Sequence, residues 1–172
     1  METAHSTKQF IQFGASAFKQ LGTPCSMYTF VSDHGIEMFA PARLPKSYRH
    51  LKGQLRMCFA NAAKAAMDDP SLIYCEGYAS SIIPVLHAWC LDPKGRVLEL
   101  TWPKPGADYF GVPFQLGFVK RQLLLNGSFG LLDQMYNRFA LVRGNYKKEE
   151  WYNDGALTRL SKKLKVNKNP RR

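Results

Sequence analysis

The chain has 172 residues, a length that fits one ordinary domain, and its 45% apolar and 22% charged content is typical of a globular protein rather than a disordered or fibrous one. The sequence has no apolar run of about 18 residues and its four cysteines form no C-x-x-C pair, so we expect neither a transmembrane segment nor a disulfide or zinc-knuckle scaffold. The formal net charge is +11, and residues 141–172 carry +7 of it, from ten basic and three acidic side chains.

Helices dominate the prediction for the first part of the chain. From the N-terminus we expect a helix over residues 7–21, a short strand over 26–32, an irregular segment over 33–53 and a helix over 54–67. Ser6 or Thr7 can cap the first helix. The last of these helices is the clearest, because its apolar residues recur at i, i+3, i+4 and i+7 without a miss and Pro70 follows its end.

The rest of the chain adds a sheet and two more helices. We expect strands over 72–79, 85–91 and 96–102, a loop rich in proline and glycine over 103–127, and helices over 128–142 and 154–164. Four aromatic residues of the loop are expected to join the core: Tyr109, Phe110, Phe114 and Phe118. These elements predict an α+β fold with helices packed on an antiparallel sheet, as a single domain over residues 1–166 followed by a basic, flexible tail over 167–172.

Three residues with the chemistry of a cysteine nucleophile lie on three consecutive predicted elements. Cys58 is near the start of the clearest helix, His87 is in the middle of a strand, and Glu99 is in the next strand. A thiol nucleophile needs a lowered pKa, which a helix N-terminus and a neighbouring imidazolium supply. The imidazole in turn needs an acceptor for its second nitrogen, and a carboxylate serves. The pattern therefore predicts a Cys-His-Glu triad.

The turn between the two strands decides whether His87 and Glu99 meet. The sequence Asp92-Pro93-Lys94-Gly95 suits a type I turn closed by a glycine in the left-handed region, which is the usual three-residue hairpin loop. Such a loop places Trp89 opposite Glu99, so that His87 and Glu99 are diagonal neighbours on one face, about 7–8 Å apart at the backbone. A loop of two or four residues would put them on opposite faces.

These motifs resemble a known family in their order and spacing. A helix with Cys58, a strand with Gly77-Tyr78, a strand with His87-Ala88-Trp89 and a strand with Glu99-Leu100-Thr101-Trp102 look like the transglutaminase-like branch of the papain-like cysteine enzymes. The resemblance covers residues 54–102, under a third of the chain. Glutamate stands here where that family usually has aspartate. The resemblance implies a papain-like core in which the cysteine-bearing helix packs on an antiparallel sheet and the terminal helices are additions.

The resemblance also implies a reaction. Cys58 would be the nucleophile, His87 the general base and acid, and Glu99 the carboxylate that orients the imidazole. The expected activity is amide hydrolysis or acyl transfer, of protease, deamidase or transglutaminase type, on a protein or peptide substrate and without a cofactor. The backbone N–H of Cys58 is one oxyanion donor, and Gln54 is a candidate for the other, although it lies closer to the cysteine than the papain-type glutamine does.

Structural interpretations of the same residues remain open. Cys58 lies on the apolar face of its helix and free cysteine is among the most buried residue types, so the fold could carry dead or repurposed chemistry. Trp89 and Trp102 are expected to be core residues of the sheet. A metal site built from Cys58, Cys75, Cys90 and His87 matches no usual zinc spacing, so we expect no metal ion and interpret Cys25, Cys75 and Cys90 as inert thiols.

The basic C-terminal end suggests a second function class. Five cationic side chains form a candidate binding patch: Arg159, Lys162, Lys163, Lys165 and Lys168. The alternative to an enzyme is therefore an inactive module of the same fold whose basic helix binds nucleic acid or an acidic protein. The first residues show neither a basic n-region nor an apolar run of a secretory signal, so we expect a cytoplasmic protein.

Overall fold

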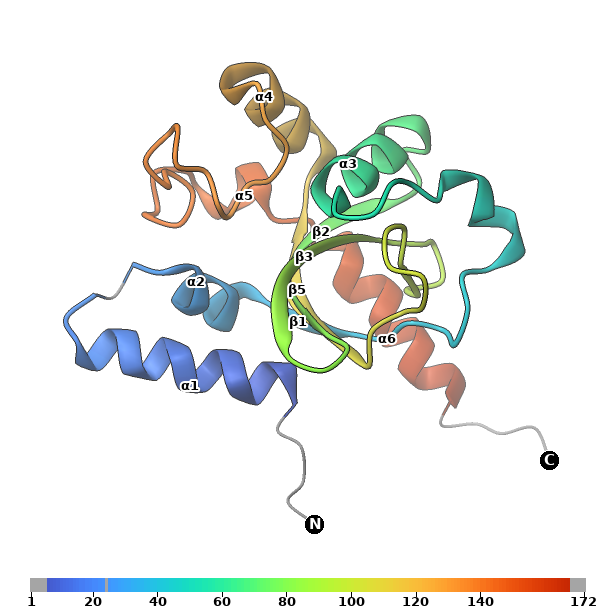
Figure 1. Ribbon diagram of the computed structural model, residues 1–172, viewed down its shortest axis with the longest axis horizontal. Helices are drawn as coiled ribbons and strands as arrows, with labels where there is room; N and C mark the ends of the chain where they lie inside the picture. The colour runs from blue at the N-terminus through green and yellow to red at the C-terminus, as the bar shows by residue number, and fades with distance from the viewer. Residues whose placement is uncertain (1–5, 24, 168–172) are drawn as a thin grey trace, which may run out of the picture.

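A computed structural model describes residues 6–23 and 25–167 of the chain. In this part the centre of the fold is an antiparallel sheet with the strand order β1-β5-β2-β3-β4 (Figure 1). The strands are β1 (Ile36–Met38), β2 (Ile73–Ser80), β3 (Pro84–Leu91), β4 (Val97–Leu98) and β5 (Asp108–Phe114). The longest pairings join β2 to β3 on one side and to β5 on the other, so β2 is central and β4 is an edge strand.

Helices surround this sheet, which confirms the expected α+β class. They are α1 (Thr7–Gln20), α2 (Met27–His34), α3 (Cys58–Asp68), α4 (Leu116–Asn126), α5 (Lys148–Trp151) and α6 (Gly155–Asn167), with a 3-10 helix η1 (Lys46–Leu51). None of the described helices is long and apolar enough to span a bilayer. Ser6 caps α1 as expected, since its side chain accepts a hydrogen bond from the backbone N–H of Gln9.

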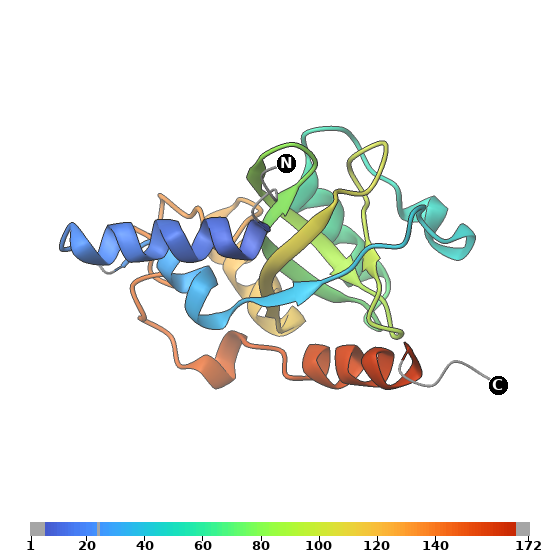
Figure 2. The same ribbon diagram turned by 90° about the horizontal axis from the view of Figure 1, so that it is seen from below.

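The two faces of the sheet pack against different helices, and alternation along β3 separates them. Ala88 and Cys90 belong to the larger core on the α3 side, where the Cys90 thiol contacts the carbonyl oxygen of Ala62 at 3.2 Å. Trp89 belongs to a second core on the opposite face, which Ala156 of α6 completes. Figure 2 shows α6 running along the side of the sheet away from α3.

The segment 26–32 forms a helix and not the predicted strand. Ser26 is the N-cap of α2, because its hydroxyl accepts from the backbone N–H of Thr29 at 3.1 Å. Phe30 and Val31 are buried by tertiary packing, which overrides their strand propensity. The region predicted as irregular, 33–53, contains both β1 and η1.

The predictions for 103–127 and 128–142 were also wrong. The first region holds β5 and α4 instead of a long loop, and its four aromatic residues are buried as expected. The second region forms successive turns and not a helix. Arg138 and Phe139 adopt left-handed φ values of 54° and 56°, and the backbone N–H of Leu132 donates to the buried carboxylate of Glu76 at 3.0 Å. That side-chain bond competes with the helical pairing the spacing suggested.

Two boundaries near the site differ from the predicted ones. The helix predicted over 54–67 begins at Cys58, because the residues before it form a turn. Within the segment predicted as a strand over 96–102, only Val97 and Leu98 form the strand β4, and Arg96 adds an isolated bridge to Phe39. The helix predicted over 154–164 is α6, which extends to Asn167. Of the predicted tail, residues 168–172 lie outside the described part of the chain.

Candidate active site

Cys58 is the first helical residue of α3, and its side chain is 9% exposed. Its N-cap residue, Met57, provides no acceptor, so no described side chain caps the first turn of this helix. The unpaired N–H groups of that turn give a positive potential where the thiol lies. Just upstream, Arg56 has a φ of 66°, a left-handed conformation that costs an L-residue about 1–2 kcal/mol. The turn at Arg56 comes directly before the helix, so the helix begins at Cys58.

The hairpin joining β3 to β4 has the predicted register. The backbone N–H of Asp92 donates to the carbonyl of Arg96 at 3.0 Å, Gly95 has a φ of 69°, and the ladder continues with Cys90 opposite Leu98. The Asp92 carboxylate accepts the backbone N–H and the side chain of Arg96, which fixes the turn. The hairpin therefore puts His87 and Glu99 on one face of the sheet, as the turn chemistry predicts.

His87 and Glu99 meet in the interior. Nε2 of His87 lies 2.9 Å from Oε2 of Glu99, and the two side chains are 2% and 1% exposed. Three further donors hold the carboxylate at 2.8 Å: the backbone N–H groups of Thr101 and Trp102 on Oε1, and the Tyr109 hydroxyl on Oε2. Burial by itself would raise the pKa of Glu99, but these hydrogen bonds and the charge of His87 keep it below its usual value. Glu99 is therefore a fixed anion.

The electrostatics of His87 point to an imidazolium. Burial by itself would lower its pKa, but hydrogen bonding and electrostatic interaction with the side chains of Cys58 and Glu99 raise it to about 9. Because Nε2 faces Glu99, Nδ1 is the nitrogen left for Cys58. The ring of Trp102 stacks on the imidazole, with ring centres 4.1 Å apart and an interplanar angle of 18°. The stack and the two hydrogen bonds fix the orientation of the ring.

Side-chain and backbone hydrogen bonds connect the start of α3 to the segment after β4, which carries Glu99. Nδ2 of Asn61 donates to Oγ1 of Thr101 at 2.9 Å and to the carbonyl of Gln54 at 2.7 Å. The backbone N–H of Gly53 donates to the carbonyl of Leu100 at 2.9 Å. These bonds hold the segment before the cysteine against the segment after β4, and so fix the thiol relative to the histidine.

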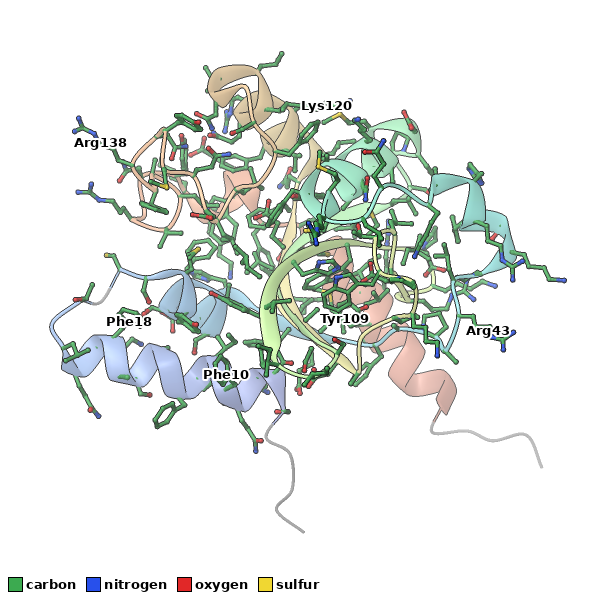
Figure 3. All side chains as sticks on the ribbon, viewed as in Figure 1. Phe10, Phe18, Arg43, Tyr109, Lys120 and Arg138 are labelled. Carbon is green, nitrogen blue, oxygen red and sulfur yellow. The ribbon has the colours of Figure 1, made fainter. Side chains whose placement is uncertain are left out.

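Sequence analysis missed three of these positioning residues. Trp102 and Tyr109 were expected only as core residues, and Asn61 was not singled out. In the structure, the ring of Trp102 stacks on His87, and the Tyr109 hydroxyl donates to Glu99. Figure 3 labels Tyr109 near the centre of the view. Asn61 had one available signal, since it is a polar residue between the apolar residues at the start of the helix.

The other predicted site residues have ordinary surroundings. Gln54 is exposed, and within the described ranges its side chain forms no hydrogen bond, so its oxyanion role stays a prediction. Cys75 and Cys90 lie on opposite faces of the sheet, and burial raises the pKa of both thiols. Cys25 is exposed. Over residues 6–23 and 25–167 no group of three histidine, cysteine or carboxylate side chains is placed to hold a metal ion.

The predicted basic patch is only partly described. Arg159 of α6 is half-buried, and its guanidinium donates to the carbonyl of Leu91 at 3.4 Å, so it packs against β3. The structure describes only the backbone of three further lysines in α6: Lys162, Lys163 and Lys165. Lys168 lies outside the described part of the chain.

Comparisons with known proteins leave the site to be interpreted from its own geometry. No protein-family model, no curated protein and no solved structure matches the chain.

Proposed function

We propose that the protein is a cysteine-dependent amide hydrolase or acyl transferase that acts on a protein or peptide. Cys58 is the nucleophile, His87 the general base and acid, and Glu99 the carboxylate that orients the imidazole. One observation carries the proposal: a buried histidine lies 2.9 Å from a fixed carboxylate, and its raised pKa reflects both that carboxylate and the thiol at the first residue of an uncapped helix. The chain order of the three residues supports a papain-like, transglutaminase-like core.

A purely structural role for these residues accounts for less of the arrangement. A buried ion pair is often no more stable than apolar residues of the same volume, so His87 and Glu99 are a poor choice for a core alone. A structural histidine also has no need of a thiol on its second nitrogen. The strained turn at Arg56 and the missing cap at Met57 both lie directly before Cys58, as expected where local stability is given up for reactivity.

The proposed reaction proceeds through a thioester. The Cys58 thiolate attacks the amide carbonyl carbon, and the electron pair of the C=O bond moves to oxygen, where the backbone N–H of Cys58 stabilises it. As the carbonyl re-forms, the C–N bond breaks and the His87 imidazolium gives its proton to the departing nitrogen, which leaves as an amine. His87, now neutral, takes a proton from water or from an acceptor amine, whose attack on the thioester releases an acid or a new amide.

An activated ester tests this proposal without knowledge of the substrate. With p-nitrophenyl acetate we expect release of p-nitrophenolate and an acetyl group on Cys58, found by intact-mass spectrometry and peptide mapping. Cys58→Ala and His87→Ala should each abolish this acetylation, because the first removes the nucleophile and the second its imidazole partner. Cys25→Ala is the matched control, since it removes an exposed thiol and should leave the acetylation unchanged. Acetyl on Cys25 in place of Cys58, or equal labelling of Cys58 in His87→Ala, would contradict the proposal.

A further inference from the structure

A cleft of about 490 Å³ borders the triad on the side of Glu99. Its walls come from two segments that are distant in the sequence, residues 42–52 before α3 and residues 99–105 after β4. Figure 3 shows Arg43, from the first wall, on the side of the molecule opposite Arg138. The reaction steps proposed for Cys58 and His87 do not use this cleft.

The charge of the cleft is strongly positive. Arg43, Arg49, Lys52 and Lys104 line it, and the only carboxylate in its described lining is Glu99. The Glu99 carboxylate is paired with the imidazolium of His87, so the four cations of the lining leave the cleft with a positive net charge. In the part of the chain that the structure describes, Arg43, Arg49 and Lys104 form no ion pair. Cations without a carboxylate partner that converge on one concave surface attract anionic ligands.

The chain between Lys52 and Cys58 limits the distance between the cleft and the proposed nucleophile. The ammonium group of Lys52 donates to the carbonyl of Glu99 at 3.2 Å and to the carbonyl of Trp102. Lys52 precedes Cys58 by six positions, and a fully extended chain of that length spans about 20 Å, which bounds the distance between them. A substrate peptide of about six residues is therefore long enough to occupy the cleft while one of its amides lies at the thiol.

We propose that this cleft is a substrate subsite that binds acidic side chains of a peptide close to the amide attacked by Cys58. The inference rests on the proposed function and adds a substrate class to it. The described lining residues favour a peptide over a nucleic acid, because Pro103 and Ala42 line the walls and none of the lining residues is aromatic, whereas single-stranded nucleic acids bind by stacking on aromatic rings. Carboxylates also match the paired donors of the two arginines.

The test is binding of fluorescein-labelled hexaglutamate to the full chain, followed by fluorescence anisotropy at about 50 mM salt, where surface charges are weakly screened. Arg43→Gln/Lys104→Gln removes one cation from each wall and should weaken binding about fivefold to tenfold. Lys120→Gln/Arg138→Gln removes the same charge from α4 and from the 128–142 segment, away from the cleft (Figure 3), and should change binding less than twofold. A labelled six-nucleotide thymidine strand is the competing probe.

Three results would overturn the inference: no hexaglutamate binding, equal weakening by both double variants, or tighter binding of the thymidine strand that only the cleft variant weakens. The acetylation assay separates these from failure of the proposed function. If the wild-type protein is not acetylated at Cys58, the proposed triad is wrong. If it is acetylated but hexaglutamate binding does not depend on the cleft, only the proposed subsite is wrong.

Discussion

Glu99→Gln is expected to slow acetylation of Cys58 by at least about 10²-fold at pH 7, because the amide no longer fixes an imidazolium. The carbonyl oxygen of the new amide can still accept from the backbone N–H groups of Thr101 and Trp102. Its NH₂ group, however, replaces the oxygen that now faces Nε2 of His87 and the Tyr109 hydroxyl. With the carboxylate gone, burial lowers the pKa of His87, and the thiol loses its charged partner.

The same substitution should make stability depend on pH in a defined direction. In the native protein the pKa of His87 is raised from 6.5 to about 9, so the charged ring stabilises the fold fully below about pH 6.5, and this contribution is lost as the pH rises through about 9. A tenfold change in acidity corresponds to about 1.4 kcal/mol, so Cys58 and Glu99 together supply on the order of 3 kcal/mol. Glu99→Gln removes the part of this stabilisation that comes from the carboxylate, and we expect the free energy of unfolding to fall by about 2 kcal/mol at pH 6.

Urea unfolding of the wild type and Glu99→Gln at pH 6 and above pH 9 measures this difference. We expect the gap in the free energy of unfolding to be largest at pH 6 and to narrow at the higher pH. Glu150→Gln is the control, because it removes a carboxylate that pairs with Arg121 on the surface, and such pairs contribute little. A gap that is the same at both pH values would show that Glu99 does not stabilise a charged His87.

Gly77→Ala is expected to destabilise the fold by about 2–4 kcal/mol or to prevent folding. Gly77 is paired with His87 on one side and with Gly111 on the other. A Cβ at Gly77 would collide with the Cα of Gly111 and the carbonyl oxygen of Phe110, and neither backbone group can move without separating β2 from β5. The strand that carries the histidine would be displaced with them.

Gly117→Ala is the matched control for this substitution. Gly117 lies in α4 without a positive φ, and apart from its chain neighbours and the backbone of its own helix, no heavy atom lies within 4 Å of the place that an alanine Cβ would take there. Alanine has the higher helix propensity, so this variant should keep or gain up to about 1 kcal/mol. Urea unfolding of both variants gives the comparison. Wild-type stability in Gly77→Ala would mean that β2 and β5 do not approach each other as the structure describes.

The part of the site that rests on local rules was predictable from the sequence. Asp92, Pro93 and Gly95 define a turn whose register does not depend on distant residues, and the register alone puts His87 and Glu99 on one face. The α+β class also follows from periodicity, since the apolar spacing of α3 and the alternation of β3 are both clear.

The remainder depends on tertiary contacts that carry no local signal. The helical state of 26–32 is set by burial of Phe30 as well as by the local Ser26 cap, and the turns of 128–142 are set partly by a carboxylate on β2. The hydroxyl of Tyr109 reaches Glu99 because β5 pairs with β2, a strand that lies far away in the sequence. For the same reason the cleft between residues 42–52 and 99–105 has no sequence signature.

Site-resolved alkylation tests the central claim most directly. The native protein is treated with limiting iodoacetamide at pH 6, and labelling of each cysteine is followed by mass spectrometry, with His87→Ala in parallel. We predict that Cys58, although 9% exposed, labels about tenfold faster than the exposed Cys25, and that His87→Ala removes this advantage, because pairing with an imidazolium makes a cysteine more reactive than an unpaired one at acidic pH. Slower labelling of Cys58 than of Cys25, or the same rate with and without His87, would contradict the triad.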